Sequence, residues 1–139
     1  MADPPEPVGL YEAFTRCGEF VFLSAISSAR SGEMITGKVG QDLSLEQGQE
    51  AARCAADNLL AVLAAAAGSD EGITALLLLR GQVNAANEFA QVHKVIDAAS
   101  ELIVQRLGDR GRHARTAIGC SALPNNNAVT LEAIARVRL

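Results

Sequence analysis

An arginine-rich segment near the end of the chain is the first place where the residue types suggest chemistry. The stretch GRHART (111–116) puts Arg115 at the head of an apolar run. A guanidinium is always charged, and its planar fork matches the two oxygens of a carboxylate. Arg115 is therefore a candidate for holding a ligand carboxylate. Taken alone, however, the residues favour a strand-end arginine that pairs with an acid on the chain's own surface.

The charged residues around Arg115 have simpler interpretations. His113 precedes it by two positions, and we interpret it as part of a rim rather than as a catalyst. Arg110 and Arg112 are interpreted as solvated loop charge. The other histidine, His93, could donate a hydrogen bond to a ligand or titrate near neutral pH, but a plain histidine on a helix surface is the preferred interpretation.

Several other chemistries have no support in the sequence. The chain contains no HExxH, no CxxC pair and no GxxxxGK[ST], so we expect neither a metal nor a cofactor. Nothing points to a Ser-His-Asp or Cys-His triad. A net charge of −4 and an aromatic content of 4% also disfavour a nucleic-acid partner.

The cysteines and the apolar runs bear on location. Cys17, Cys54 and Cys120 are odd in number and scattered, which is typical of reduced thiols in a cytoplasmic protein. The first residues lack the pattern of a signal peptide, and no apolar run approaches the ~20 residues of a membrane span. We therefore expect a cytoplasmic protein with no membrane partner, in which Cys120 is a buried apolar filler.

Two amphipathic helices are predicted. Over 44–68 Ser44 can cap the first, with Gln47 in the capping-box position and Gly68 at the exit. Apolar residues recur at helical spacing along one face of this segment. The second is predicted over 87–108, with Asn87 as N-cap and Gly108 after its end.

The remaining segments predict strands. A turn is expected at 16–18, followed by a strand over 19–27. The run 73–84 is apolar without alternation, as in a strand that is buried on both faces. Two strands close the chain, at 114–122 and 128–139, and the last nearly alternates. The order predicts a single α+β domain with both helices on one face of a mixed sheet. Residues 1–9, which hold three of the four prolines, form a loose N-terminal arm.

Four short stretches of the sequence together resemble a known family. The stretches TGKVGQDLS, GRHARTAIG and LEAIARV, together with GLYEA near the start, are similar to the RidA/YjgF family. The likeness runs from about Gly9 to Val137. It is stronger to the branch described as YjgF/chorismate-mutase-like putative endoribonucleases.

The resemblance implies a chorismate-mutase-like (YjgF-type) fold and a homotrimer with a central barrel of three sheets. Ligand clefts would lie between subunits. RidA itself hydrolyses 2-imino acids and enamines to 2-keto acids and ammonia. The implied ligand is thus a small carboxylate, a 2-imino or 2-keto acid.

The resemblance also implies site residues. Arg115 falls on the family arginine that grips the substrate carboxylate, and Tyr11 and Ser24 match residues that line the cleft. His93 lies near the position where many members carry an asparagine. Ala25 and Ile26 follow Ser24 directly, where the family commonly has Gly-Gln-Ile, so one wall of the cleft should differ.

The position of the family's water-activating glutamate holds Thr130. A threonine hydroxyl titrates far too high to act as a base and can only orient a water. Glu132, on the same strand face, and Glu12 are alternative carboxylates. We therefore expect a deaminase that relies on Arg115, Thr130 and Glu132, or else a non-catalytic trimer that binds a small carboxylate. An endoribonuclease is the third reading, which the acidic composition disfavours.

Overall fold

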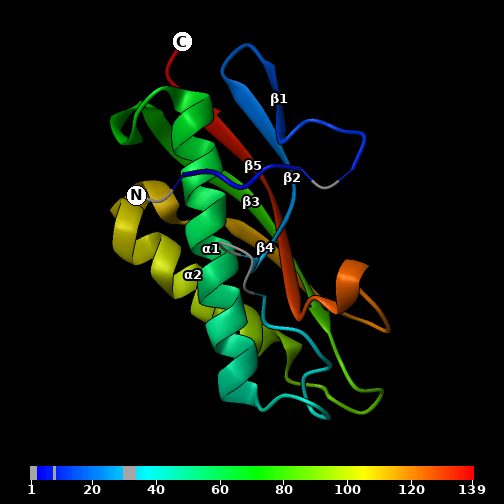
Figure 1. Cartoon of the computed structure of the whole chain (residues 1–139). Helices are drawn as coiled ribbons and strands as arrows, with labels where there is room; N and C mark the ends of the chain where they lie inside the picture. The colour runs from blue at the N-terminus through cyan, green and yellow to red at the C-terminus, as the bar shows by residue number, and fades with distance from the viewer. Residues whose placement is uncertain (1–2, 8, 30–33) are drawn as a thin grey trace.

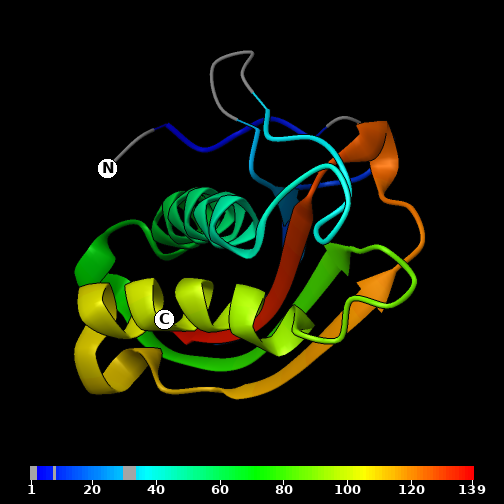
Figure 2. The same cartoon turned by 90° about the horizontal axis from the view of Figure 1, so that it is seen from below.

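The structure is a computed structural model that describes residues 3–7, 9–29 and 34–139. Its helices and strands in chain order are β1 (Phe14–Cys17), β2 (Phe20–Ser27), α1 (Leu45–Ala67), β3 (Ile73–Asn84), α2 (Val92–Leu107), β4 (Ala114–Cys120) and β5 (Val129–Val137). The sheet order is β1-β2-β5-β3-β4. Only the β3–β4 pair is parallel in this sheet, so the sheet is mixed. Both helices lie on one side of it (Figures 1 and 2), as the sequence predicted.

Helix α1 begins and ends as predicted. The Ser44 hydroxyl accepts a hydrogen bond from the Gln47 amide, and the Gln47 side chain accepts one from the Ser44 amide, which completes the capping box. Gly68 ends the helix in the left-handed region, with φ of 86°. The predicted apolar stripe is the buried face, including Ala52, Leu59 and Leu63.

Helix α2 starts four residues later than predicted. Gln91 takes the N-cap position without a side-chain cap, and Asn87 lies exposed in the preceding loop. Phe89 lies inside the predicted helical range but packs from this loop against the core, and its side chain would lie 2.9 Å from a Cβ added to Gly40. Because the loop has its own hydrophobic anchor, the apolar pattern extends beyond the helix.

The central strands match their predicted ranges, while the first hairpin does not. β3 spans the predicted residues, and β5 buries Val129, Leu131, Ala133, Ala135 and Val137 on its core face. The turn expected at 16–18 is wrong, because β1 continues to Cys17 and the turn lies at Gly18–Glu19. A positive φ of 61° at Gly18 explains why the chain reverses there.

The sheet face away from the helices is apolar and open. Phe20, Phe22, Leu77 and Ile118 are each between 37% and 48% exposed there. The expectation that β3 needs cover on both faces is therefore met on one face by the helices. The other face has no cover within the described residues of a single chain.

Two smaller expectations are corrected. Arg110 is not solvated loop charge, because its guanidinium donates to the carbonyls of Leu107, Asp70 and Ile73 and ties the end of α2 to β3. Cys120 is only partly buried.

Part of the predicted N-terminal arm (1–2 and 8) and of the loop before Met34 (30–33) lies outside the described residues. In the part that is described, no helix has the length and apolar content needed to cross a membrane.

Candidate functional site

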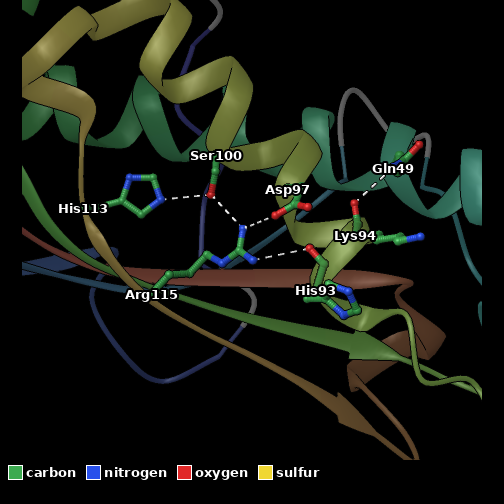
Figure 3. A network of polar contacts seen from close by, with 7 residues as sticks. All are labelled: Gln49, His93, Lys94, Asp97, Ser100, His113 and Arg115. Carbon is green, nitrogen blue, oxygen red and sulfur yellow. Dashed lines mark hydrogen bonds and ion pairs between the residues drawn. The ribbon is translucent and has the colours of Figure 1, made fainter.

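Arg115 lies on β4 at one edge of the sheet. It pairs with Leu79 of β3, a fully buried core residue, so its side chain leaves the sheet on the helix-covered face. There it reaches α2 (Figure 3). The side chain remains 23% exposed, which leaves room for a further partner.

The guanidinium of Arg115 is held on one side and free on the other. Nη1 donates to Asp97 Oδ1 at 2.8 Å and to Ser100 Oγ at 3.1 Å, and Nη2 donates to the His93 carbonyl at 3.4 Å. A guanidinium has five N–H groups, so two remain, on Nε and Nη2, without a partner among the described residues. These two nitrogens form one edge of the planar group. The protein thus fixes the guanidinium and leaves a fork that matches a carboxylate.

The histidines contribute to this cluster in different ways. The Ser100 hydroxyl accepts from Arg115 and lies 2.9 Å from His113 Nε2. Nδ1 of His113 donates to the Gly111 carbonyl at 2.5 Å, so the ring is held between Ser100 and the loop before β4. His93 offers Arg115 its backbone oxygen, while its ring points away from the guanidinium (Figure 3).

Two residues of this cluster, Asp97 and Ser100, were not predicted from the sequence. They follow His93 at spacings of four and seven residues, so all three share one face of α2. That polar stripe was a visible signal. It could not be told from an ordinary solvated face until the packing of α2 on β4 was known.

Tyr11, Ser24 and Thr130 meet elsewhere, around a cavity of about 200 Å³. Ser24 lies where the pairing of β2 with β5 shifts register between Leu23 and Ile26, a bulge that opens the sheet at this point. The Ser24 hydroxyl donates to the Glu12 carbonyl at 2.6 Å. The arm residues Pro5, Glu6 and Pro7 form one wall of the cavity, and in Figure 1 the arm crosses α1.

Thr130 begins a polar chain that crosses the open face of the sheet. Its hydroxyl donates to Gln82 Oε1 at 2.9 Å, and Gln82 Nε2 donates to Glu132 Oε1 at 3.1 Å. Arg80 Nη1 lies 3.9 Å from the same carboxylate oxygen. Glu132 therefore faces Gln82 and Arg80, and it does not line the cavity with Thr130.

The predicted site residues thus form two groups that one chain does not bring together. Arg115 lies on the helix face of an edge strand, whereas Thr130 lies on the open face of β5, two strand spacings of about 4.8 Å away. Tyr11 and Ser24 belong to the opposite edge of the sheet. Among the described residues, no three His, Cys, Asp or Glu side chains are grouped so that they could hold a metal ion.

Comparison with known proteins identifies the family of the chain. Residues 4–137 match the family model "YjgF/chorismate_mutase-like, putative endoribonuclease". The chain is 39% identical to Atu1372, a protein of unknown function from Agrobacterium tumefaciens; the match covers 95% of this chain and 85% of that one, with a TM-score of 0.89. A putative endoribonuclease from Shewanella oneidensis is 26% identical, with coverage of 98% and 91% and a TM-score of 0.93.

A curated relative extends the comparison to a eukaryote. Protein TCP17 of Trypanosoma cruzi is 35% identical over 104 residues, which are 74% of this chain and 65% of that protein. The matched stretch thus spans just under two thirds of that relative's length. The family match, in contrast, takes in almost the whole sequence. On this evidence the chain belongs to the YjgF/chorismate mutase-like family.

Proposed function

We propose that this protein binds small carboxylates, 2-imino or 2-keto acids, in clefts between copies of itself, and that Arg115 holds the carboxylate. The single observation that carries the proposal is the state of the Arg115 guanidinium. Three of its N–H groups are engaged by Asp97, Ser100 and His93, while Nε and one N–H of Nη2 have no partner in the part of the chain that the structure describes. An anchored fork loses little entropy when it binds a ligand.

The cleft is completed by a second copy. Arg115 and the cavity lined by Tyr11, Ser24 and Thr130 lie at opposite edges of one sheet. A neighbouring protomer that covers the open apolar face would bring its own Arg115 to the cavity of the first. We infer a homotrimer with three such clefts, which is the assembly that the family resemblance implies.

The reaction proposed for the cleft is hydrolysis of a 2-imino acid. A water oxygen forms a bond to the imine carbon as the C=N π bond breaks, and one proton of that water passes to the nitrogen, which gives a carbinolamine. The hydroxyl proton of the carbinolamine then moves to the nitrogen while the C=O bond forms and the C–N bond breaks, and a 2-keto acid and ammonia are released. Thr130 can orient the water through its oxygen lone pairs, because its proton is given to Gln82.

A non-catalytic carboxylate-binding trimer is the second candidate, and the same contacts favour it. The Thr130 proton is committed to Gln82, and Glu132 is engaged by Gln82 and Arg80 rather than by the cavity. Tight binding of a 2-keto acid without turnover of the imine would select this reading.

The experiment replaces Arg115 with alanine and compares it with Arg112→Ala. Arg112 is exposed and pairs only with Asp109, three residues earlier, among the described residues, so it is a matched control. Calorimetry with a 2-keto acid should show about 100-fold weaker binding for Arg115→Ala, since charged hydrogen-bond pairs are worth about 1.5–3 kcal/mol each. Arg112→Ala should bind like wild type.

Turnover is measured separately with a 2-imino acid generated in situ by an amino-acid oxidase. Wild type should accelerate its loss, and Arg115→Ala should not. If wild type and Arg115→Ala bind the 2-keto acid equally, the carboxylate role is wrong. If binding depends on Arg115 while the imine decays at the uncatalysed rate, the protein is a binder and not an enzyme.

A further inference from the structure

The cavity beside Tyr11 offers a ligand mostly apolar surface. Its walls include Pro5, Pro7, Ile26, Met34 and Val62, and its volume is about 200 Å³. Such a space admits a small branched or aromatic group. The polar atoms that line it are few. Whether these atoms act as hydrogen-bond donors or acceptors therefore decides which polar group of a ligand can bind there next to its apolar part.

The Thr130 hydroxyl presents an acceptor to this space. The residue is 8% exposed and borders the cavity, and its proton is donated to Gln82 Oε1 at 2.9 Å. What remains on the oxygen is lone-pair density. A ligand atom that approaches Thr130 is therefore favoured when it carries a proton to donate.

The remaining polar groups agree with this polarity. The Ser24 proton is committed to the Glu12 carbonyl, which leaves its oxygen as an acceptor. Among the described lining residues Glu6 carries the only full charge, and it is negative. The hydroxyls of Tyr11 and Ser27 can turn to donate or accept, and the Asn125 amide, also in the lining, carries both a donor and an acceptor. A carboxylate or keto oxygen that approaches Thr130 or Ser24 would meet oxygen lone pairs.

We infer that the cavity binds an N–H donor, an ammonium or protonated imine, that is attached to a small apolar group. The inference rests on the proposed function in one respect, because the carboxylate of the same ligand would be held by Arg115 of a neighbouring copy. The preferred ligand is then an amino or imino acid with an apolar side chain. The corresponding 2-keto acid lacks the donor and binds more weakly.

The test uses two probes with the same apolar skeleton, 3-methylbutylamine and 4-methylpentanoate. The amine has no carboxylate and so does not depend on Arg115. Calorimetry should show that the amine binds wild type and Arg115→Ala equally. Thr130→Val, which removes the acceptor at constant shape, should weaken the amine about tenfold, and Glu6→Gln about threefold. Thr130→Ser, which keeps the hydroxyl, should stay within about threefold of wild type.

NMR contacts in the wild type, from the methyl groups of the amine to those of Met34 and Ile26, show where the amine binds. Because they are measured on the wild type, they do not depend on whether a variant folds. Amine binding that is absent from the wild type, unchanged by Thr130→Val, or located away from Met34 overturns the inference. These outcomes leave the role of Arg115 intact. Conversely, amine binding without any Arg115-dependent 2-keto acid binding keeps the inference and removes the proposed function.

Discussion

The two halves of the proposed site differ in every respect that matters for binding. The α2–β4 edge offers donors, a fixed positive charge and solvent access around Arg115. The β2–β5 cavity offers acceptors, apolar walls and one negative charge, on Glu6. An amino or imino acid has the complementary ends. Since one sheet separates the two halves, assembly of copies should matter more for function than any single contact.

The largest expected effect comes from a substitution that touches neither half. Phe22→Glu places a charge on the open apolar face, where Phe22 is 45% exposed. Burial of an unpaired carboxylate between protomers costs several kcal/mol, so the assembly should dissociate to monomers. Light scattering after size exclusion measures the mass, and calorimetry measures 2-keto acid binding, which should be lost.

The control for Phe22→Glu is Glu46→Lys, on an exposed position of the first turn of α1. It alters charge without altering the open face and should leave mass and binding unchanged. A monomeric Phe22→Glu protein that still binds the 2-keto acid with wild-type affinity would break the comparison, because each half would then act alone.

A smaller effect is expected from Gly81→Ala, which should disturb the α2–β4 edge and leave the β2–β5 cavity unchanged. A Cβ on Gly81 would lie 2.5 Å from Cδ1 of Ile96, so the buried Ile96 side chain must move, and we expect α2 to shift away from β3 with it. Overpacking of this kind costs about 1–3 kcal/mol, measurable by denaturant unfolding. The shift should weaken carboxylate binding at the α2–β4 edge.

Binding of 3-methylbutylamine serves as the internal control for Gly81→Ala, because the cavity lies at the other edge of the sheet. It should be unchanged. Equal losses for both probes would show that the two edges move as one unit. A double variant with Ile96→Val removes the Cδ1 contact and should recover part of the stability.

The sequence predicted the regular elements better than it predicted the site. Helix 44–68 has residues that mark its ends, Ser44, Gln47 and Gly68. Strand 73–84 is marked by an apolar run without alternation. The predicted start of α2 was wrong because Phe89 has the spacing of a helix-face residue but packs from the preceding loop. Arg115 was identified through a motif. Its partners Asp97 and Ser100 depend on how α2 packs on β4, which local pattern does not encode.

The finest test of the comparison concerns Asp97, which both orients Arg115 and competes with the ligand for it. Asp97→Asn keeps an oxygen that can accept from Nη1 and removes one negative charge next to the fork. The pair is partly exposed, with Asp97 at 50%, so screening keeps the gain small. Binding of a 2-keto acid should tighten by about two- to fivefold, while 3-methylbutylamine should not respond. Asp109→Asn, at the exposed pair with Arg112, is the control and should change neither. If Asp97→Asn instead binds the 2-keto acid more weakly, the orientation that Asp97 gives to the Arg115 guanidinium outweighs its competition with the ligand. Asp97 would then strengthen carboxylate binding at the α2–β4 edge rather than limit it.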